Sequence, residues 1–262
     1  MRCIQVSFLG ACVAFGVFVE PVVAQNVRRD ATAVAAVQAA IVAMQGTQQA
    51  SSIGTAVLNG HATKYTNGQP SQQRFLTKYK VLDGTVAFRR ELTSDQDTSV
   101  FASGGKRPVF QLPDGRSHRF GKHVAMAAPP FDLPLLVLWQ IINNSLYEFI
   151  LKNDSMPSIV HVQLENPSDP LMKKITRQDW YFDATTYLPL RVIYEVPDVT
   201  SPSTTIKANC DYLQFQPIDF GIVVPVQMKL YEEADLVEAI TVDSVRINGT
   251  VEQDFDMPQG DN

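Results

Sequence analysis

The chain of 262 residues is 45% hydrophobic and 19% charged, and its formal net charge is −5 at pH 7. This length is ample for burying a core, and all-β domains routinely reach it. Acidic residues are spread along the chain and no basic patch occurs, so the charge argues against nucleic acid as a partner.

The first residues have the order of a secretory signal peptide. Arg2 supplies a positive charge, an apolar run follows from Ile4 to Val19, and Val22 to Ala24 form a small-residue cleavage site. Export machinery recognises this order of charge, apolar run and small residues. We therefore expect the mature protein to begin at Gln25 and to be exported.

Cleavage there divides the chain into a signal peptide, residues 1–24, and a single mature domain, residues 25–262. A membrane anchor is the first alternative, but Glu20 stops the apolar run before the roughly 20 residues that a span needs. The second alternative is a lipid anchor on Cys12, which ends a lipobox-like sequence. The mature domain keeps one cysteine, Cys210, which excludes an internal disulfide and favours a small buried strand residue.

A helix is predicted over residues 31–45. Asp30 is a suitable N-cap, and apolar residues then recur at three- and four-residue spacing on one face. These residues are Val34, Val37, Ile41 and Met44. The helix is expected to lie against a larger element.

From residue 55 onward the hydrophobic period changes to two, which is typical of strands. Strands are predicted at Thr55–Tyr65, Gln73–Val81, Thr85–Leu92, Thr98–Ala102 and Pro108–Leu112. Turns between them are predicted at Asn67-Gly68, Asp83-Gly84, Gly104-Gly105 and Asp114-Gly115. Alternation is clear in Val86, Phe88, Arg90 and Leu92. This segment therefore reads as a block of antiparallel hairpins.

A second helix is predicted from Leu133 to Leu151. Asp132 is its expected cap, and Pro134 falls in the first turn, where a missing N–H costs little. Because the segment is apolar on most of its circumference, we expect a buried helix or a lid over an apolar surface.

The rest of the chain returns to strands. They are predicted at Ser158–Glu165, Asp179–Asp183, Pro189–Val196, Thr204–Gln216, Val223–Glu232 and Val237–Asn248. The order of the predicted elements is helix, strands, helix, strands. This order predicts an α+β fold with helices gathered on one side of an antiparallel sheet.

The hairpin over residues 179–194 has a clear pattern of faces. Trp180 and Phe182 share one face of a strand, while Tyr181 and Asp183 share the other. Leu190, Val192 and Tyr194 of the next strand are expected to face the same aromatic side.

Several segments resemble the LolA-like proteins of the bacterial periplasm. Asp179–Val192 is similar to their tryptophan hairpin, which ends in a Leu-Pro-x-Arg pattern. Cys210–Phe215 and Gly221–Pro225 are similar to a strand pair of that superfamily. Thr241–Asn248 and Phe255–Pro258 resemble the way those chains finish. These are signatures of a fold rather than of an active site.

The resemblance implies a strongly curved antiparallel sheet that forms an unclosed half β-barrel covered by helices. It also implies an apolar cavity between sheet and helices, and a non-catalytic role in binding or carrying an acyl chain, a lipid or a lipoprotein. An envelope membrane protein is a further candidate partner. The lid would be the helix from Leu133 to Leu151. Two alternatives stay open: an interaction or sensor module whose cavity its own side chains fill, and an unrecognised secreted hydrolase.

The residues expected to line the cavity are large and apolar for the most part. They are Phe75, Tyr79, Phe88, Leu136, Trp139, Trp180, Phe182, Val192 and Tyr194. Each one taken singly is equally consistent with ordinary core, because every sheet has an apolar face.

The sequence contains no constellation that predicts catalysis or a bound metal or cofactor. It has no G-x-S-x-G elbow, P-loop or H-E-x-x-H motif. His118 and His123 lie in a segment expected to be a solvated loop, without the three or four ligands that a metal site needs. We therefore expect neither catalytic residues nor cofactors.

Overall fold

The computed structural model describes residues 27–45, 50–82, 85–95, 97–103, 109–111, 117–119, 131–154, 156–197 and 205–251. Several predicted features lie outside these residues: the signal peptide with Cys12 and its cleavage site, the turns at 83–84, 104–105 and 114–115, His123, and the segment 255–258.

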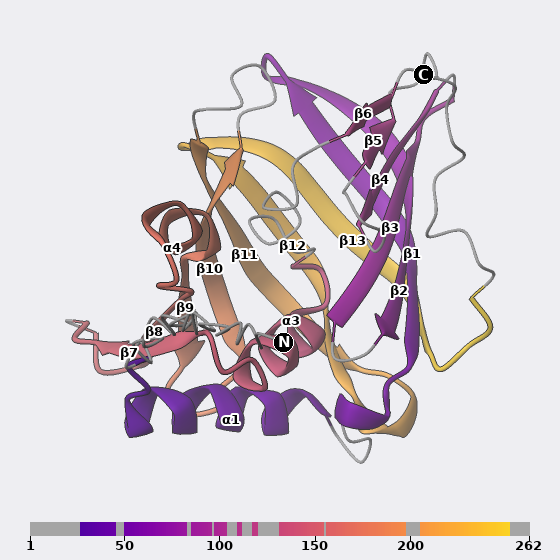
Figure 1. Cartoon of the computed structure of the whole chain (residues 1–262). Helices are drawn as coiled ribbons and strands as arrows, with labels where there is room; N and C mark the ends of the chain where they lie inside the picture. Colours follow the sequence, from indigo (N-terminus) through magenta and orange to yellow (C-terminus); the bar gives the residue numbers. More distant parts are fainter. Residues whose placement is uncertain are drawn as a thin grey trace, which may run out of the picture.

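Thirteen strands within the described residues form one antiparallel sheet (Figure 1). They are β1 (Thr55–Thr66), β2 (Gln69–Leu82), β3 (Thr85–Thr93), β4 (Thr98–Ser103), β5 (Val109–Gln111), β6 (Ser117–Arg119), β7 (Glu148–Lys152), β8 (Ile159–Glu165), β9 (Gln178–Asp183), β10 (Pro189–Pro197), β11 (Thr205–Pro217), β12 (Val223–Glu232) and β13 (Asp235–Ile247). Their order is β6-β5-β4-β3-β2-β1-β13-β12-β11-β10-β9-β8-β7, so β6 and β7 are opposite edges and the barrel stays unclosed.

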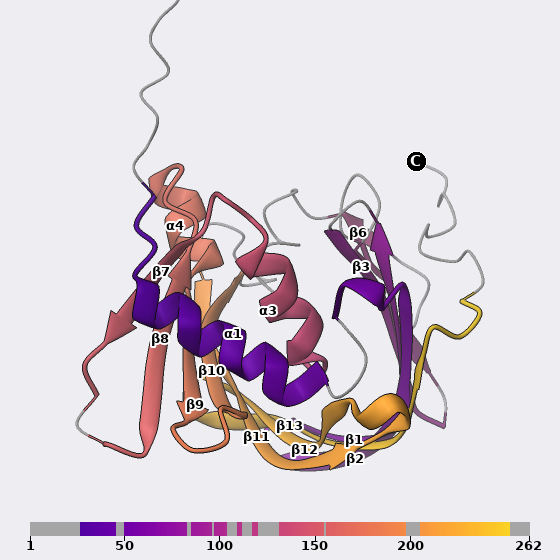
Figure 2. The same cartoon turned by 90° about the horizontal axis from the view of Figure 1, so that it is seen from below.

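In the part of the chain that the structure describes, two helices lie on the concave side of this sheet, α1 (Ala31–Gln45) and α3 (Pro134–Ile142) (Figure 2). They pack against each other and between the two arms of the curved sheet, with α1 touching β7, β8 and β12 and α3 touching β3. Short 3₁₀ turns occur at Ala50–Ser52 and Asp219–Gly221. The predicted half-barrel covered by helices is confirmed.

The first helix forms as predicted. The Asp30 carboxylate accepts a hydrogen bond from the Thr32 backbone N–H at 3.0 Å, which caps the helix. Val37, Ile41 and Met44 are buried, while Val34 is half-buried. Small alanines fill the rest of the buried face: Ala33, Ala36 and Ala40. They let the helix approach the sheet closely.

The prediction for the second helix was wrong at both ends. The helix stops at Ile142, where the Asn143 side-chain amide donates to the Trp139 carbonyl at 2.8 Å, and residues 148–152 form strand β7 instead. Asp132 is not its cap; Leu133 holds that position without a side-chain hydrogen bond. Pro134 does occupy the first turn, as expected.

Strand β7 forms because the chain before α1 completes its edge. The Phe149 N–H donates to the Arg28 carbonyl, and the Asp30 N–H donates to the Phe149 carbonyl, each at 2.9 Å. Phe149 is fully buried on the core side. Arg29 lies over its ring at 4.4 Å and donates to the Ile142 carbonyl at 2.9 Å, which ties this segment to the end of α3.

Two further elements, besides β7, were not predicted. Helix α4 (Pro170–Thr176) begins at Asp169, whose carboxylate accepts from the Met172 N–H at 2.8 Å. It lies on the outer face of the sheet, since it covers Glu165, which points away from the core residue Leu164. The helices are therefore not all on one side. The second element, β6, contains His118, which the sequence placed in a loop.

The β9–β10 hairpin confirms most of its predicted faces. Trp180 and Phe182 are fully buried and their rings lie nearly parallel with centroids 6.0 Å apart, while Tyr181 and Asp183 are half-buried on the other face. Leu190 was wrongly predicted to face the aromatic side. It is 38% exposed, because the pairing register shifts between Pro189 and Arg191.

One glycine allows a close approach in the middle of the sheet. The pairing of β1 with β13 shifts register between Asn59 and Gly60. A Cβ at Gly60 would lie 2.1 Å from the Thr241 carbonyl oxygen and 2.8 Å from the Phe75 ring. Only glycine fits there, and such irregularities increase the local bend of a sheet.

Candidate ligand-binding cavity

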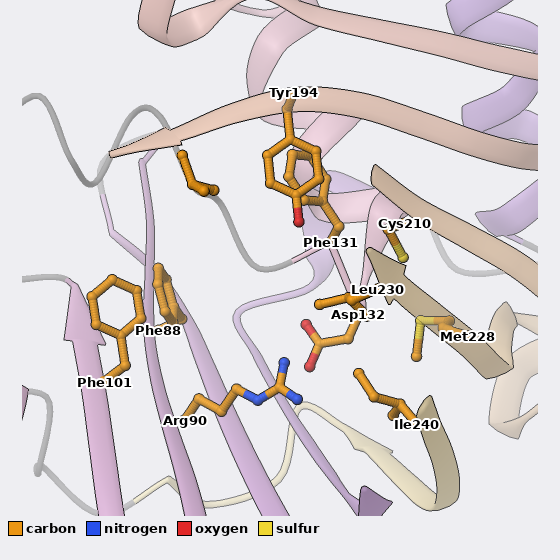
Figure 3. A pocket seen from close by; sticks show the side chains of 11 residues that line it. Phe88, Arg90, Phe101, Phe131, Asp132, Tyr194, Cys210, Met228, Leu230 and Ile240 are labelled. Carbon is orange, nitrogen blue, oxygen red and sulfur yellow. The ribbon is translucent and has the colours of Figure 1, made fainter. Parts of the chain in front are cut away.

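A cavity of about 150 Å³ lies between the concave face of the sheet and the residues that precede α3 (Figure 3). Its lining comes from six strands besides that segment: Phe88, Arg90, Phe101, Phe131, Asp132, Tyr194, Val196, Cys210, Met228, Leu230 and Ile240. An engineered apolar cavity of roughly this volume holds a benzene molecule, whereas sites for drug-sized ligands begin near about 300 Å³. The cavity therefore fits a compact apolar group.

Aromatic rings form much of the wall. The rings of Phe88 and Phe101 lie 5.3 Å apart, and those of Phe131 and Tyr194 lie 4.2 Å apart. The Tyr212 hydroxyl donates to the Phe131 carbonyl at 3.0 Å, which fixes the segment that closes the cavity. The backbone of this segment is therefore held by the sheet that it covers.

A buried carboxylate follows Phe131. Asp132 is only 3% exposed and accepts hydrogen bonds from the Thr77 hydroxyl at 3.0 Å and from the Tyr79 hydroxyl, both on β2. Burial raises the pKa of Tyr79 well above its usual value, and the negative charge of Asp132 raises it further. Tyr79 therefore remains a protonated donor.

Arg90 is the cation of the cavity wall. Its Nη2 donates to Glu238 Oε1 on β13 at 2.8 Å, and its guanidinium lies 5.6 Å from the centre of the Phe75 ring. Burial acts to lower the pKa of Arg90, but the charges of Glu238 and Asp132 outweigh it and raise that pKa. Within the described part of the chain, its guanidinium makes no further hydrogen bond, and its buried Nε has no partner.

Cys210 contributes its thiol to the same wall. It is 1% exposed, as the sequence predicted. Burial, with a smaller effect from the charge of Asp132, raises the pKa of its thiol far above the usual range. A thiol held in the protonated form is a poor nucleophile, so Cys210 acts as a small apolar residue here.

Two of the nine predicted cavity residues, Phe88 and Tyr194, line the cavity. The other seven do not. Six of these are buried in the surrounding core: Phe75, Tyr79, Leu136, Trp180, Phe182 and Val192. The seventh, Trp139, is half-buried against that core.

The polar residues of the wall were missed by sequence reasoning. Arg90 had a detectable signal, because it alternates with Phe88 and Leu92 and so falls on the apolar face of β3. Asp132 was assigned to helix capping instead. Met228, Leu230 and Ile240 are cavity residues only because the curve of the sheet brings β12 and β13 to the same space as β3, β4 and β10, which no local pattern indicates.

A second cavity of about 380 Å³ lies on the outer face, around His161, Asp179 and Tyr181. Its carboxylates are already paired: Asp179 contacts His161 at 3.0 Å and Arg177 at 3.2 Å. Burial acts to raise the pKa of Asp179, but the hydrogen bond from His161 and the charge of Arg177 outweigh it and lower that pKa. This ionic lining is that of a surface network rather than of an apolar ligand site.

Within the described residues, no group of three or more His, Cys, Asp or Glu side chains is placed to hold a metal ion. Among the same residues, no helix has the length and hydrophobicity needed to cross a membrane.

No protein-family model matches the sequence, and no curated protein matches it significantly. Solved structures do. A putative outer membrane lipoprotein-sorting protein domain from Vibrio parahaemolyticus has a TM-score of 0.56 at 13% identity, over 85% of this chain and 95% of that one.

Two further structures match over similar lengths. A DUF1329 family protein from Desulfovibrio piger has a TM-score of 0.54 at 17% identity, covering 83% of this chain and 93% of that one. A LolA superfamily protein from Nitrosomonas europaea has a TM-score of 0.55 at 10% identity, covering 86% and 97%. The chain therefore has the LolA-like fold, as its segments suggested.

Proposed function

We propose that this chain is an exported, non-catalytic protein that binds an apolar ligand in the cavity between the sheet and the helices. The ligand is an acyl chain, a lipid or the acyl group of a lipoprotein. The observation that carries the proposal is the cavity itself, walled by side chains such as Phe88, Phe131 and Met228 and closed by the segment before α3. Concave apolar surfaces of this kind are the usual form of small-ligand sites.

The size of the cavity limits how much of a ligand enters. Burial contributes about 25 cal/mol per Å² of apolar surface, so even the end of an acyl chain gains a useful affinity. A longer chain requires the segment around Phe131 to move away from Tyr194, and among the described contacts three side-chain hydrogen bonds hold Phe131 and Asp132 to the sheet. The residues that begin α3 are thus the lid of the proposed carrier, in place of the longer helix that the sequence suggested.

The comparison with solved structures supports a carrier role by analogy. The Vibrio parahaemolyticus protein is described as a putative outer membrane lipoprotein-sorting protein domain. A shared fold at this identity does not transfer a cargo, since one fold hosts many functions. The proposal therefore names only the class of ligand and the class of partner. The partner is an envelope membrane protein or a lipoprotein.

The proposed location is the periplasm. Residues 1–24 are proposed to be removed on export, leaving residues 25–262 as one domain. Mass spectrometry of the intact protein, recovered from a periplasmic extract, tests this. A mass that begins at Gln25 supports it, and a diacylated mass that begins at Cys12 would show the lipid-anchored form instead.

A sensor or interaction module is the second candidate function. The observation that favours it is the small volume of the cavity, beside which large side chains such as Trp180 and Phe182 are fully buried. Such a module would bind a partner with its surface and would hold no lipid.

The carrier proposal is tested by extracting the purified protein with organic solvent and identifying any lipid by mass spectrometry, followed by displacement of a fluorescent fatty acid. We expect bound lipid and saturable displacement. The matched variants are Ile240→Phe, which places a ring in the cavity, and Val42→Phe, which places the same ring at an exposed position of α1. Only Ile240→Phe should weaken binding.

Circular dichroism checks that both variants fold. If solvent extraction of the wild-type protein yields no lipid and the protein does not bind the fluorescent fatty acid, the carrier role is wrong. The sensor module is then the better account.

A further inference from the structure

The Tyr194 hydroxyl and all but one of the Arg90 N–H groups face the cavity without an acceptor among the described residues. The Tyr194 hydroxyl points into it from β10, and the Arg90 guanidinium points into it from β3 on the opposite wall (Figure 3). Tyr194 makes no hydrogen bond within the described part of the chain, and Arg90 uses only one of its five N–H donors there, on Glu238.

Such donors are costly in an otherwise apolar site. A buried polar group without a partner loses the free energy of its hydration, about 1–3 kcal/mol. A pure hydrocarbon in the cavity would displace water from both donors and would satisfy neither. A ligand that carries an oxygen between Tyr194 and Arg90 would accept from both.

The charges around the cavity restrict that oxygen to a neutral group. Arg90 is already paired with Glu238, and the Asp132 carboxylate lies on the same wall. The formal charges of these three groups sum to −1. A free carboxylate or phosphate would therefore meet a net negative wall in a site of low dielectric, where like charges repel strongly.

We propose that the ligand carries a neutral acceptor oxygen, such as an ester or amide carbonyl, which receives hydrogen bonds from Tyr194 and Arg90 while its alkyl part fills the apolar remainder. This inference rests on the proposed function and narrows it. It favours esterified or amide-linked acyl groups over free fatty acids and over plain alkyl chains.

Three probes of equal chain length test this inference by calorimetry: a short methyl ester, the corresponding free carboxylate and the corresponding alkane. The variants are Tyr194→Phe, which removes only the hydroxyl, and Arg90→Lys, which keeps a cation for Glu238 but lacks the guanidinium fork. Tyr147→Phe is the control, since Tyr147 is equally buried but does not line the cavity.

We expect the wild-type protein to bind the ester more tightly than the carboxylate. Tyr194→Phe should weaken ester binding about three- to tenfold, the value of one hydrogen bond, and should leave alkane binding unchanged. Arg90→Lys should act in the same direction, and Tyr147→Phe should have no effect on any probe.

Two results would overturn the inference while leaving the carrier role intact: equal losses for ester and alkane in Tyr194→Phe, or tighter binding of the carboxylate in the wild-type protein. If none of the three probes binds the wild-type protein, the inference and the proposed function both fail.

Discussion

The Tyr79 hydroxyl of β2 donates a hydrogen bond to the Asp132 carboxylate, and this contact holds the segment before α3 against the sheet. The two residues are 53 positions apart in the chain. The contact therefore joins the first block of strands to the helix that covers them.

Removing this donor should destabilise the protein. Tyr79→Phe leaves the buried Asp132 with the Thr77 hydroxyl as its remaining donor within the described contacts, so the free energy of unfolding should fall by about 1–3 kcal/mol. Urea denaturation followed by circular dichroism measures it. Tyr65→Phe, at a half-buried position at the far end of β1, should change stability by less than about 0.5 kcal/mol. Equal effects of the two variants would contradict the role of the contact.

The Arg90–Glu238 pair should behave as a partly buried ion pair. Arg90→Met or Glu238→Met alone leaves a charge without its partner and should cost about 3 kcal/mol. The double variant should be more stable than either single variant, because no unpaired charge remains. A double-mutant cycle in urea gives the coupling free energy, and strictly additive losses would show that the pair is not coupled.

Gly60 should be intolerant of a side chain. Gly60→Ala places a methyl group against the Thr241 carbonyl at 2.1 Å, so either the β1–β13 pairing must shift or the protein loses about 1–3 kcal/mol of stability. Thermal denaturation measures the loss. Gly249→Ala is the control, because its new Cβ would meet nothing closer than Arg246 Cβ at 3.9 Å. A melting temperature that is unchanged in Gly60→Ala would argue against the close approach.

Stability should depend on pH through Asp179. Its folded-state pKa is lowered below the ordinary 3.8, so it contributes stability above the unfolded-state pKa and loses that contribution as the pH falls through the folded-state pKa. The difference in unfolding free energy between the wild-type protein and Asp179→Asn should therefore be largest near neutral pH and should shrink in acid. If this difference in unfolding free energy grows as the pH falls, the lowered folded-state pKa of Asp179 is contradicted.

Much of this fold was predictable because its strands carry local signals. The alternation in β3 and β9 and the Asn67-Gly68 turn, with both residues at positive φ, indicate hairpins without any tertiary information. The Asp30 cap and the apolar spacing after it likewise define α1.

The errors came from residues whose partners are distant in sequence. Phe149 continues the helical spacing of α3, but pairing with Arg28 and Asp30 makes it a strand residue. Asp132 has the sequence context of a helix cap, yet two hydroxyls of β2 bind it. Helix α4 was missed although Asp169-Pro170 is a sound start signal, because its seven residues are too short for periodicity to show.

The cavity itself was predictable only in outline. An apolar sheet face and an apolar helix predict an enclosed space between them. Which side chains line that space depends on how closely α3 packs against the concave face of the sheet. Phe88 and Tyr194 line the cavity, whereas Trp180 and Phe182 are buried in the core and do not line it. A hydrophobic period of 2 residues in a strand or 3.6 residues in a helix does not distinguish cavity-lining residues from core residues.

The main-chain bonds between residues 28–30 and Phe149 have a consequence for solubility. An uncovered border strand offers its amides and carbonyls to any extended polypeptide nearby. Here the start of the folded domain occupies part of that position on β7, so the protein shields this border with its own leading residues. A variant that begins after Asp30 would leave the N–H and C=O groups of Phe149 without these partners. Two copies of such a variant would tend to pair through the exposed edge of β7.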